Sequence, residues 1–242
     1  MTSNRENNDS ASQKNISDFG EALKKASEII EKYNDIVITT HVNPDGDAIG
    51  SVLAMYFYLE AKGKNPTVIN HSPTPENLKF LSGTENIWVF DPQHDKEIIS
   101  NAGLIIVLDV NDSKRIKDLQ YPVLESDAYK MVIDHHIDPK EFADHYAVDT
   151  DASSTGEILY KLFSLDNEFQ LSKEIAENLY AAVMTDSGSF RFPRTDSEVH
   201  RIIADLLDAG ADPVNIYDMV YNTVPYPGFQ LGCGVTVLGE CE

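Results

Sequence analysis

The sequence predicts an α/β fold in which helices flank a mainly parallel β-sheet. Short β-branched or apolar runs alternate with helical stretches along the chain, and this alternation is typical of βαβ units. The continuous apolar run Leu104–Leu108 is expected in a strand that is covered on both faces of the sheet. Because ligands of such sheets bind beyond the carboxyl ends of the strands, the residues that end the strands are the first candidates for a site.

The predicted elements follow one another closely. A helix is expected over residues 16–33, a buried strand over 35–41, a turn over 43–47 and a helix over 48–61, which Gly63 is well placed to end. Further strands are expected at 66–70, 88–90, 103–108, 130–133 and 146–149. Further helices are expected at 75–81, 154–163, 172–185, 196–209 and 213–221.

Length and composition favour a cytoplasmic protein. A chain of 242 residues can form one large α/β domain, or one domain and the start of another. Residues 1–15 are polar and lack the apolar region of a signal peptide, so we expect a disordered leader. No apolar run is long enough to span a bilayer. Cys233 and Cys241 match no zinc motif and no disulfide framework, which favours free thiols in a reducing compartment.

The charge balance argues against long duplex DNA as a partner. The formal net charge is −21, from 40 acidic and 19 basic residues, and no basic cluster is present. Proteins that bind the phosphates of long nucleic acids usually carry a basic face. Solubility accounts for most of the acidic excess. Several aspartates, however, lie in apolar contexts where solvation is not their purpose.

Aspartate and histidine residues follow three of the predicted strands, and an aspartate ends one helical stretch. In a parallel sheet these strand ends share an edge, where clustered carboxylates repel one another and lose solvation unless a divalent metal neutralises them. The candidates are His41, Asp45 and Asp47 after the first strand, Asp109 and Asp112 after 103–108, Asp134, His135 and His136 after 130–133, and Asp186 at the end of a helical stretch.

This donor set exceeds the needs of one ion and suits two ions that share a bridging carboxylate. Mixed oxygen and nitrogen ligands favour manganese, iron, cobalt or zinc over calcium. A pair of such ions is a known device for hydrolysing phosphate esters, so the pattern predicts metal-dependent hydrolysis. The alternatives are structural: Asp47 and Asp109 could each cap a helix, and a histidine at an apolar edge could simply pack there.

The motifs resemble those of the DHH phosphoesterase family. The similar stretches agree with the family in order and spacing, and they are His41–Ser51, Asp109, Asp134–His136 and Thr185–Phe192. The last stretch is most like the group of bifunctional oligoribonucleases and 3′-phosphoadenosine-5′-phosphate phosphatases. The resemblance implies a metal-binding catalytic domain over residues 16–222 with the fold of the family's N-terminal domain. It also implies hydrolysis of short oligonucleotides or 3′-phosphoadenosine 5′-phosphate by water that two metal ions activate.

The resemblance further implies a role for each matching residue. Two divalent ions, expected to be manganese, would be bound: one by His41 and Asp45, the other by Asp47, His135 and Asp186, with Asp109 as the bridge. His136 would face the substrate phosphate, and Asp134 would orient an imidazole by accepting its ring N–H. Three residues are candidates for substrate contact, with helix capping as the alternative for the second and a surface salt bridge for the third: Asn43, Ser154 and Arg191.

The C-terminal residues depart from the family pattern. Members of this group carry a second domain with a Gly-Gly-Gly-His motif that binds the substrate, and this sequence has no such motif. We therefore expect residues 223–242 to be a truncated or divergent linker. The alternatives for the function are a non-catalytic metal- or nucleotide-binding module, a cyclic-dinucleotide phosphodiesterase and a pyrophosphatase. The expected partner is a small nucleotide or short oligonucleotide, and no membrane partner is expected. A homodimer is compatible with the sequence.

Overall fold

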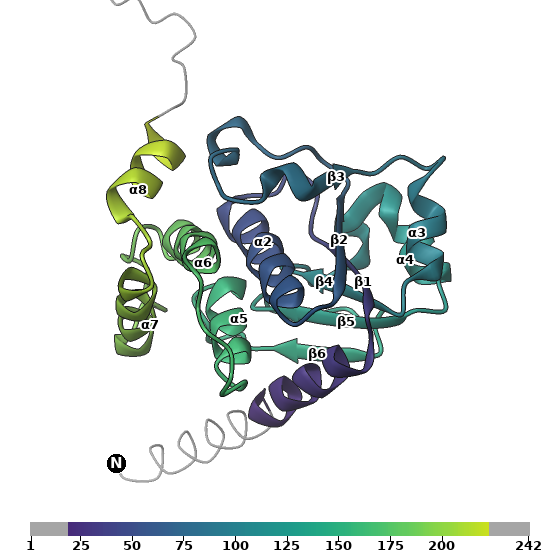
Figure 1. Cartoon of the computed structure of the whole chain (residues 1–242), viewed down its shortest axis with the longest axis horizontal. Coiled ribbons are helices and arrows are strands. Elements are labelled where there is room, and N and C mark those ends of the chain that lie inside the picture. The colour runs from purple at the N-terminus through teal and green to yellow at the C-terminus, as the bar shows by residue number, and fades with distance from the viewer. Residues whose placement is uncertain (1–18, 223–242) are drawn as a thin grey trace, which may run out of the picture.

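The centre of the fold is a six-stranded sheet in the order β3-β2-β1-β4-β5-β6 (Figure 1). A computed structural model describes residues 19–222 of the chain. Every neighbouring pair of strands is parallel, which confirms the predicted fold class. The strands are β1 (Asp35–Thr39), β2 (Asn65–Asn70), β3 (Ile87–Val89), β4 (Leu104–Leu108), β5 (Tyr129–Asp134) and β6 (His145–Val148).

Some helices connect successive strands, and further helices follow the last strand towards the C-terminal end of the described residues. Residues 19–32 are also helical, in agreement with the first predicted helix. The named helices are α2 (Gly46–Ala61), α3 (Asp95–Asn101), α4 (Gln120–Glu125), α5 (Thr155–Phe163), α6 (Lys173–Asp186), α7 (Ser197–Asp208) and α8 (Pro213–Tyr221). Three short 3₁₀ segments are η1 (Glu76–Leu78), η2 (Thr84–Asn86) and η3 (Ser113–Leu119). The expected leader over 1–15 and the expected linker over 223–242 lie outside the described residues.

Most predicted elements are confirmed, and the differences concern one strand end, one predicted helix and two helices that were not predicted. The first strand stops at Thr39 and not at His41, and just beyond its end the Thr40 hydroxyl donates to the Leu108 carbonyl at 2.8 Å. The predicted helix over 75–81 is only the 3₁₀ segment η1. Two helices on the far face of the sheet, α3 and α4, were not predicted.

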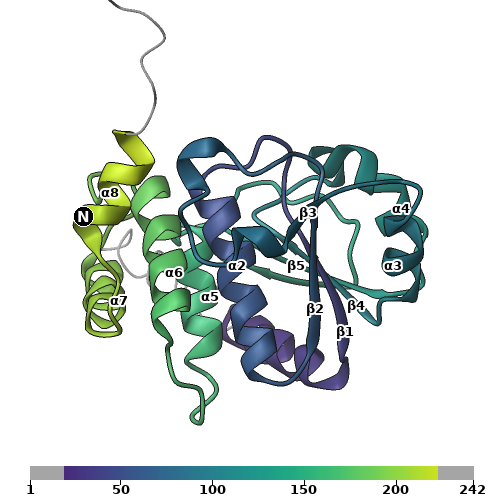
Figure 2. The ribbon, with the colours of Figure 1, turned by 45° about the horizontal axis from the view of Figure 1, so that its top comes forward.

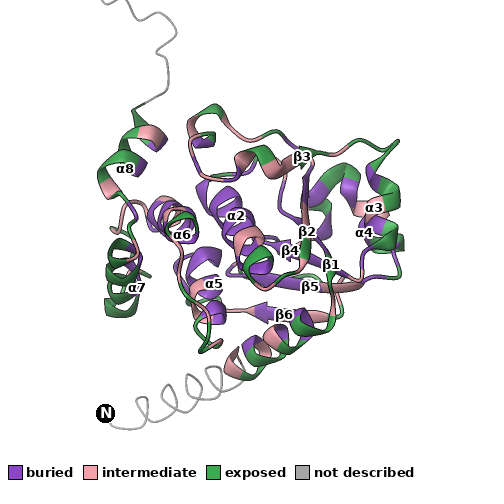
Figure 3. Ribbon diagram, in the orientation of Figure 1, coloured by how far each residue is buried: buried purple, intermediate pink, exposed green. Residues whose placement is uncertain are grey.

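The strands send alternate side chains into two separate cores. In β4, Leu104, Ile106 and Leu108 belong to one core, and Ile105 and Val107 belong to the other. The first core lies under α2, α5 and α6, and the second lies under α3 and α4 (Figures 1 and 2). The central strands are therefore buried on both faces, as Figure 3 shows for β4 and β5. This explains why their sequences are continuously apolar.

The order of the strands creates a crevice at one place. The chain runs from β1 outward to β2 and β3, and then returns to the other side of β1 to form β4. Two neighbouring connections thus diverge between β1 and β4, and ligands of open α/β sheets bind at such a point, beyond the carboxyl ends of the strands. No helix among residues 19–222 is both long and apolar enough to cross a bilayer.

Close contact between α2 and α6 fixes one wall of this crevice. Gly50 of α2 lies against α6, and a Cβ atom at Gly50 would come within 2.3 Å of the Asn178 carbonyl oxygen. Real Cβ atoms do not approach a backbone oxygen so closely, so glycine is required for the two helices to meet. The contact matters for the site, because α2 carries Asp47 and α6 ends with Asp186.

We expect Gly50→Ala to separate α2 from α6 and to lower the free energy of unfolding by about 1–3 kcal/mol or more, as overpacking does in other cores. The matched control is Gly20→Ala, since nothing lies within 4 Å of a Cβ at that helical position. Alanine there should be neutral or stabilise by up to about 1 kcal/mol. Urea denaturation of both variants measures the difference, and equal stabilities would contradict this account of the contact.

Candidate metal centre

Four segments bring acidic and imidazole side chains together at the carboxyl edge of the sheet. His41 follows β1, Asp109 directly follows β4, and His135 directly follows β5. Asp47 lies in the first turn of α2, and Asp186 is the last residue of α6. The predicted strand ends thus meet beside the crevice between β1 and β4.

Three groups of three residues could hold a metal ion, and one of them, Asp109, His135 and His136, shares a residue with each of the other two. The ligand atoms of His41, Asp45 and Asp109 lie within 4.8 Å of one another. The same limit holds for Asp47, His135 and Asp186. These two groups contain the ligands that the resemblance implied for each ion. Asp109 belongs to the first group and also lies next to the second, because its Oδ1 is 3.5 Å from His135 Nε2.

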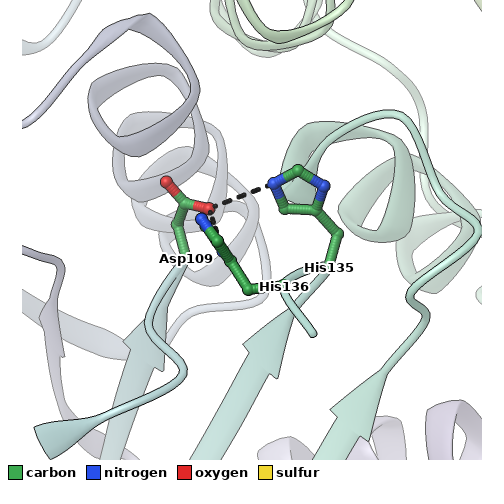
Figure 4. Close-up of side chains that lie close together, drawn as sticks. All are labelled: Asp109, His135 and His136. Atoms are coloured by element: carbon green, nitrogen blue, oxygen red, sulfur yellow. Dashed lines mark ion pairs between the residues drawn. The ribbon is translucent and has the colours of Figure 1, made fainter. Parts of the chain in front are cut away.

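Asp109 is the centre of the cluster. Its side chain is buried, and its carboxylate faces the rings of His135 and His136 (Figure 4). Its Oδ2 lies 3.2 Å from His41 Nε2, and Thr155 donates its hydroxyl to Oδ1 at 3.1 Å. Burial raises the pKa of Asp109, but three neighbouring imidazoles outweigh it and hold the pKa below the ordinary value. These imidazoles therefore favour the carboxylate form of Asp109 between both groups.

The backbone at Asp109 is strained. Its φ is +61°, in the left-handed region that residues other than glycine rarely adopt. Such a conformation costs about 1–2 kcal/mol and persists where the surrounding structure enforces it. The Asp109 amide donates to the Ile133 carbonyl of β5 at 3.0 Å, which fixes this turn against the neighbouring strand. The strain directs the carboxylate into the cluster.

The tautomer of His41 suits a metal ligand. Its Nδ1 lies 2.9 Å from the Val42 carbonyl, and because a carbonyl only accepts, Nδ1 carries the hydrogen. The Nε2 lone pair therefore faces Asp109 and, at 3.9 Å, Asp45. Burial lowers the pKa of His41, but the contacts with Asp109 and the Val42 carbonyl outweigh it and raise the pKa overall. Without a metal the cluster thus attracts a proton to the atom that a metal would occupy.

Asp47 is held rigidly by the start of α5. Its two carboxylate oxygens accept the amides of Thr155 at 2.7 Å and Gly156 at 2.9 Å, and Oδ1 also accepts the Ser51 hydroxyl at 3.2 Å. Burial raises its pKa well above the ordinary value, and Asp109 and Asp186 add to the effect. Asp47 does not cap α2. Asp45 does so, by accepting the Ala48 amide at 3.1 Å.

His135 points one nitrogen at three carboxylates. Its Nε2 lies 3.2 Å from Asp186, 3.5 Å from Asp109 and 3.8 Å from Asp47. Its buried Nδ1 has no hydrogen-bond partner among residues 19–222. Burial also raises the pKa of Asp186, with a further contribution from Asp109. The group of Asp47, His135 and Asp186 thus has too little positive charge to balance its two carboxylates.

His136 differs from the other two histidines. Its Nδ1 lies 2.7 Å from Asp134 Oδ1 and donates to that fully buried carboxylate. Its Nε2 faces the Arg115 guanidinium at 3.5 Å. The hydrogen bond to Asp134 raises the pKa of His136, against the opposing effect of burial. Asp134 thus accepts a ring N–H from His136, and the Nδ1 of His136 offers no lone pair to an ion.

The donor set fits a pair of divalent cations. Among the described residues, no lysine or arginine forms an ion pair with Asp45, Asp47, Asp109 or Asp186. The carboxylates are balanced only by imidazoles, and the pKa values of Asp47 and Asp186 are raised by their shared burial and repulsion. Carboxylate oxygens with imidazole nitrogens are ligands of manganese, iron, cobalt and zinc. Binding of such ions would relieve the repulsion that the structure shows.

The structure gives mixed outcomes for the three residues predicted to contact the substrate. Ser154 is fully buried, and its hydroxyl caps α5 by accepting the Glu157 amide at 3.1 Å, so it offers no surface to a substrate. Arg191 is exposed, and its Nε donates to the Gly188 carbonyl at 2.8 Å. Asn43 is exposed in the loop after β1, where its φ is +52°. The last two assignments stay predictions.

Sequence reasoning missed two residues of the centre. Thr155, which follows the candidate Ser154 at the start of α5, donates its amide to Asp47 and its hydroxyl to Asp109. Arg115 lies in η3 and reaches His136 from the connection after β4. A single arginine in a charged surface-like stretch carries no periodic signal, so only the folded connection reveals its place.

Comparison with known proteins places the chain in a family. The family model described as the DHH family, N-terminal domain, matches residues 35–183. The chain belongs to the DHH family. That family and its members named oligoribonuclease and PAP phosphatase are phosphoester hydrolases, and its enzymes depend on metal ions. The predicted resemblance is therefore confirmed.

Individual relatives are similar over most of this chain. The bifunctional oligoribonuclease and PAP phosphatase NrnA of Bacillus subtilis is 30% identical over 196 residues, which cover 80% of this chain and 59% of that protein. The protein of the same name from Thermus thermophilus is 31% identical over 201 residues, which cover 83% and 58%. The chain thus spans less than two thirds of the length of these relatives.

One solved structure agrees with the fold closely. It is the crystal structure of an exopolyphosphatase-related protein from Bacteroides fragilis, with a TM-score of 0.82 and 35% sequence identity. The match covers 86% of this chain and 62% of that one. The likeness supports the α/β architecture described above.

The raised pKa values of Asp47 and Asp186 predict how stability depends on pH. Because the folded, metal-free chain binds these protons more tightly than the unfolded chain, its stability should fall as the pH rises above about 4. Since Mn²⁺ competes with the protons, added Mn²⁺ should raise the melting temperature more at about pH 7.5 than at about pH 5.

Thermal melting with Mn²⁺ or with a chelator tests this expectation. Asp47→Asn should reduce the dependence on pH, because it removes one of the two carboxyls whose pKa is raised. Asp127→Asn is the matched control, since Asp127 is an exposed aspartate outside the cluster. An equal Mn²⁺ effect at both pH values in the unaltered chain would contradict the metal assignment.

Proposed function

We propose that this chain hydrolyses phosphoester bonds of short oligonucleotides or of 3′-phosphoadenosine 5′-phosphate. The observation that carries the proposal is the pair of ligand groups joined at Asp109. His41 and Asp45 would hold one ion, Asp47, His135 and Asp186 the other, and Asp109 would bridge them. Manganese is the proposed metal, and the catalytic domain is proposed to span residues 16–222. The relatives that support this substrate class are named for those two activities.

The chain's own residues prepare the site for a phosphoryl group. When bound, two divalent ions lower the pKa of a water molecule and offset the charge that builds on the phosphoryl oxygens. Asp134 accepts the Nδ1–H of His136 and fixes the ring that is proposed to face the substrate phosphate, while the Nε2 atom of that ring lies beside the Arg115 guanidinium. Arg115 adds a fixed positive charge beside that nitrogen. These two side chains complement a negatively charged substrate in an otherwise acidic site.

The partners and location of the chain belong to the same proposal. A small nucleotide or short oligonucleotide is the proposed partner, in the cytoplasm, with a homodimer as an allowed state. The match covers 59% of the Bacillus subtilis relative, so the activity of that whole protein is proposed for this chain and is not assigned to it by the match alone. A non-catalytic metal- or nucleotide-binding module is the alternative.

We expect His135→Ala and Asp109→Asn to lower Mn²⁺-dependent hydrolysis by roughly 100-fold or more, because each removes several kcal/mol of charge stabilisation. The assay measures release of phosphate or mononucleotide from 3′-phosphoadenosine 5′-phosphate, a diadenylate, a cyclic dinucleotide and pyrophosphate. His94→Ala is the control, since that side chain is 77% exposed and pairs only with Asp91. Unchanged turnover in both site variants would refute the assignment, and Mn²⁺ binding without turnover would favour the non-catalytic module.

Arg115→Ala should lower kcat by roughly 10- to 1000-fold, because it removes a charged donor that lies beside His136. Arg115→Lys should restore part of the loss, since the charge remains while the guanidinium geometry is absent. The exposed Arg201, which lies in α7, provides the matched control Arg201→Ala. Equal rates for Arg115→Ala and the unaltered chain would exclude this role for Arg115.

A further inference from the structure

A pocket of about 320 Å³ adjoins the candidate metal centre at Asp186. Asp186 and Ser187 contribute the end of α6 to its wall, and the loop 192–195 supplies most of the rest. The volume lies at the lower end of the range for small-molecule sites. Because Asp186 belongs both to this pocket and to one of the ligand groups, a molecule bound here extends directly from the metal centre.

The loop beside this pocket has an unusual backbone. Helix α6 ends in a Schellman motif, in which Ser189 donates its amide to the Met184 carbonyl at 2.8 Å and Gly188 donates to Thr185 at 3.2 Å. Gly188, Ser189 and Phe190 then have φ values of +60°, +57° and +64°. Two of these three consecutive left-handed residues are not glycine, so the turn is strained. Strain of this kind is concentrated at functional sites.

The strained turn sends two aromatic side chains in different directions. Phe190 packs against Tyr180 in the core, with ring centroids 5.8 Å apart. Phe192 is 54% exposed and lies over Gly188, where any Cβ atom would come within 2.6 Å of its ring. The absence of a side chain at Gly188 thus lets the Phe192 ring rest against the backbone. A single exposed phenylalanine is ordinary, but this one is seated in a pocket that includes Asp186.

Two polar groups of the pocket are left for a ligand. Thr195 Oγ1 is buried and has no hydrogen-bond partner among residues 19–222. Arg194 lines the pocket, and within the described part of the chain its guanidinium forms no ion pair. In contrast, the hydroxyl of Ser153 donates to Glu157 and that of Ser187 to the Met184 carbonyl. The pocket is therefore lined by an aromatic ring, a guanidinium group and a threonine whose hydroxyl has no partner among residues 19–222.

We propose that this pocket binds the nucleobase of a nucleotide whose phosphoryl group lies at the metal centre. The position of the phosphoryl group rests on the proposed function. Phe192 is the surface on which the base stacks, and Thr195 donates to or accepts from the edge of the base. Arg194 adds a positive charge and a second planar face. The pocket thus selects nucleosidic phosphoesters over phosphates that carry no base.

The test compares binding of adenosine 5′-monophosphate with binding of ribose 5-phosphate, by calorimetry with Mn²⁺ present. The two probes share the phosphate and the sugar and differ only in the base. Phe192→Ala should weaken binding of the nucleotide by about 10-fold, within the range of roughly 5- to 150-fold for loss of a stacked base, and leave binding of ribose 5-phosphate unchanged. Phe192→Tyr should retain the preference, since it keeps the ring.

Two further variants separate a binding role from a structural one. Thr195→Val keeps the shape of the side chain and removes the unpaired hydroxyl. It should therefore weaken binding of the nucleotide by a few-fold and leave binding of ribose 5-phosphate unchanged. Tyr121→Ala is the matched control, because it removes an aromatic side chain that is 72% exposed on α4, on the other face of the sheet. A ratio of the two affinities that Phe192→Ala leaves unchanged would overturn the proposal.

The outcome for the pocket is independent of the outcome for hydrolysis. A chain that hydrolyses phosphoesters but shows no effect of Phe192→Ala on the affinity ratio retains the proposed function and refutes the pocket. A chain without hydrolysis whose preference for the nucleotide depends on Phe192 supports the pocket and refutes the enzymatic proposal.

Discussion

The constraint on which the rest of the structure depends is the gathering of three aspartates, Asp45, Asp47 and Asp186, around the buried Asp109. Asp109, whose pKa is held below its ordinary value by neighbouring imidazoles, lies in a strained backbone conformation at the end of β4. Its neighbours, Asp47 and Asp186, resist ionisation because burial and repulsion raise their pKa values. Only bound cations relieve this repulsion without protonating the site. The fold must therefore be stable enough to hold the cluster in place when the ions are absent.

The fold supplies that stability with elements that also position the ligands. The sheet is buried on both faces, so the ends of β1, β4 and β5 are fixed relative to one another. The close approach of α2 to α6 sets the separation between Asp47 and Asp186. The start of α5 holds Asp47 in place by donating two backbone amides to its carboxylate. The same contacts that pack the core thus determine the geometry of the site.

Much of this arrangement could be predicted from the sequence, and the limits have physical reasons. Continuous apolar strands predicted the sheet, the residues that end them predicted a metal site, and the family resemblance implied both ligand groups. Helices α3 and α4 were missed because each has seven residues or fewer, too few for a clear helical period. Arg115, Thr155 and the Phe192 pocket depend on contacts between distant segments or on a left-handed turn, which no local pattern encodes.

The most direct test of the central claim is whether two manganese ions bind as a coupled pair through Asp109. Metal analysis with electron paramagnetic resonance at low temperature measures both the stoichiometry and the magnetic coupling. The account predicts two Mn²⁺ per chain with a spin-coupled signal, and loss of the coupling in Asp109→Asn. A single uncoupled Mn²⁺ per chain, or a coupled signal that persists in Asp109→Asn, would contradict it.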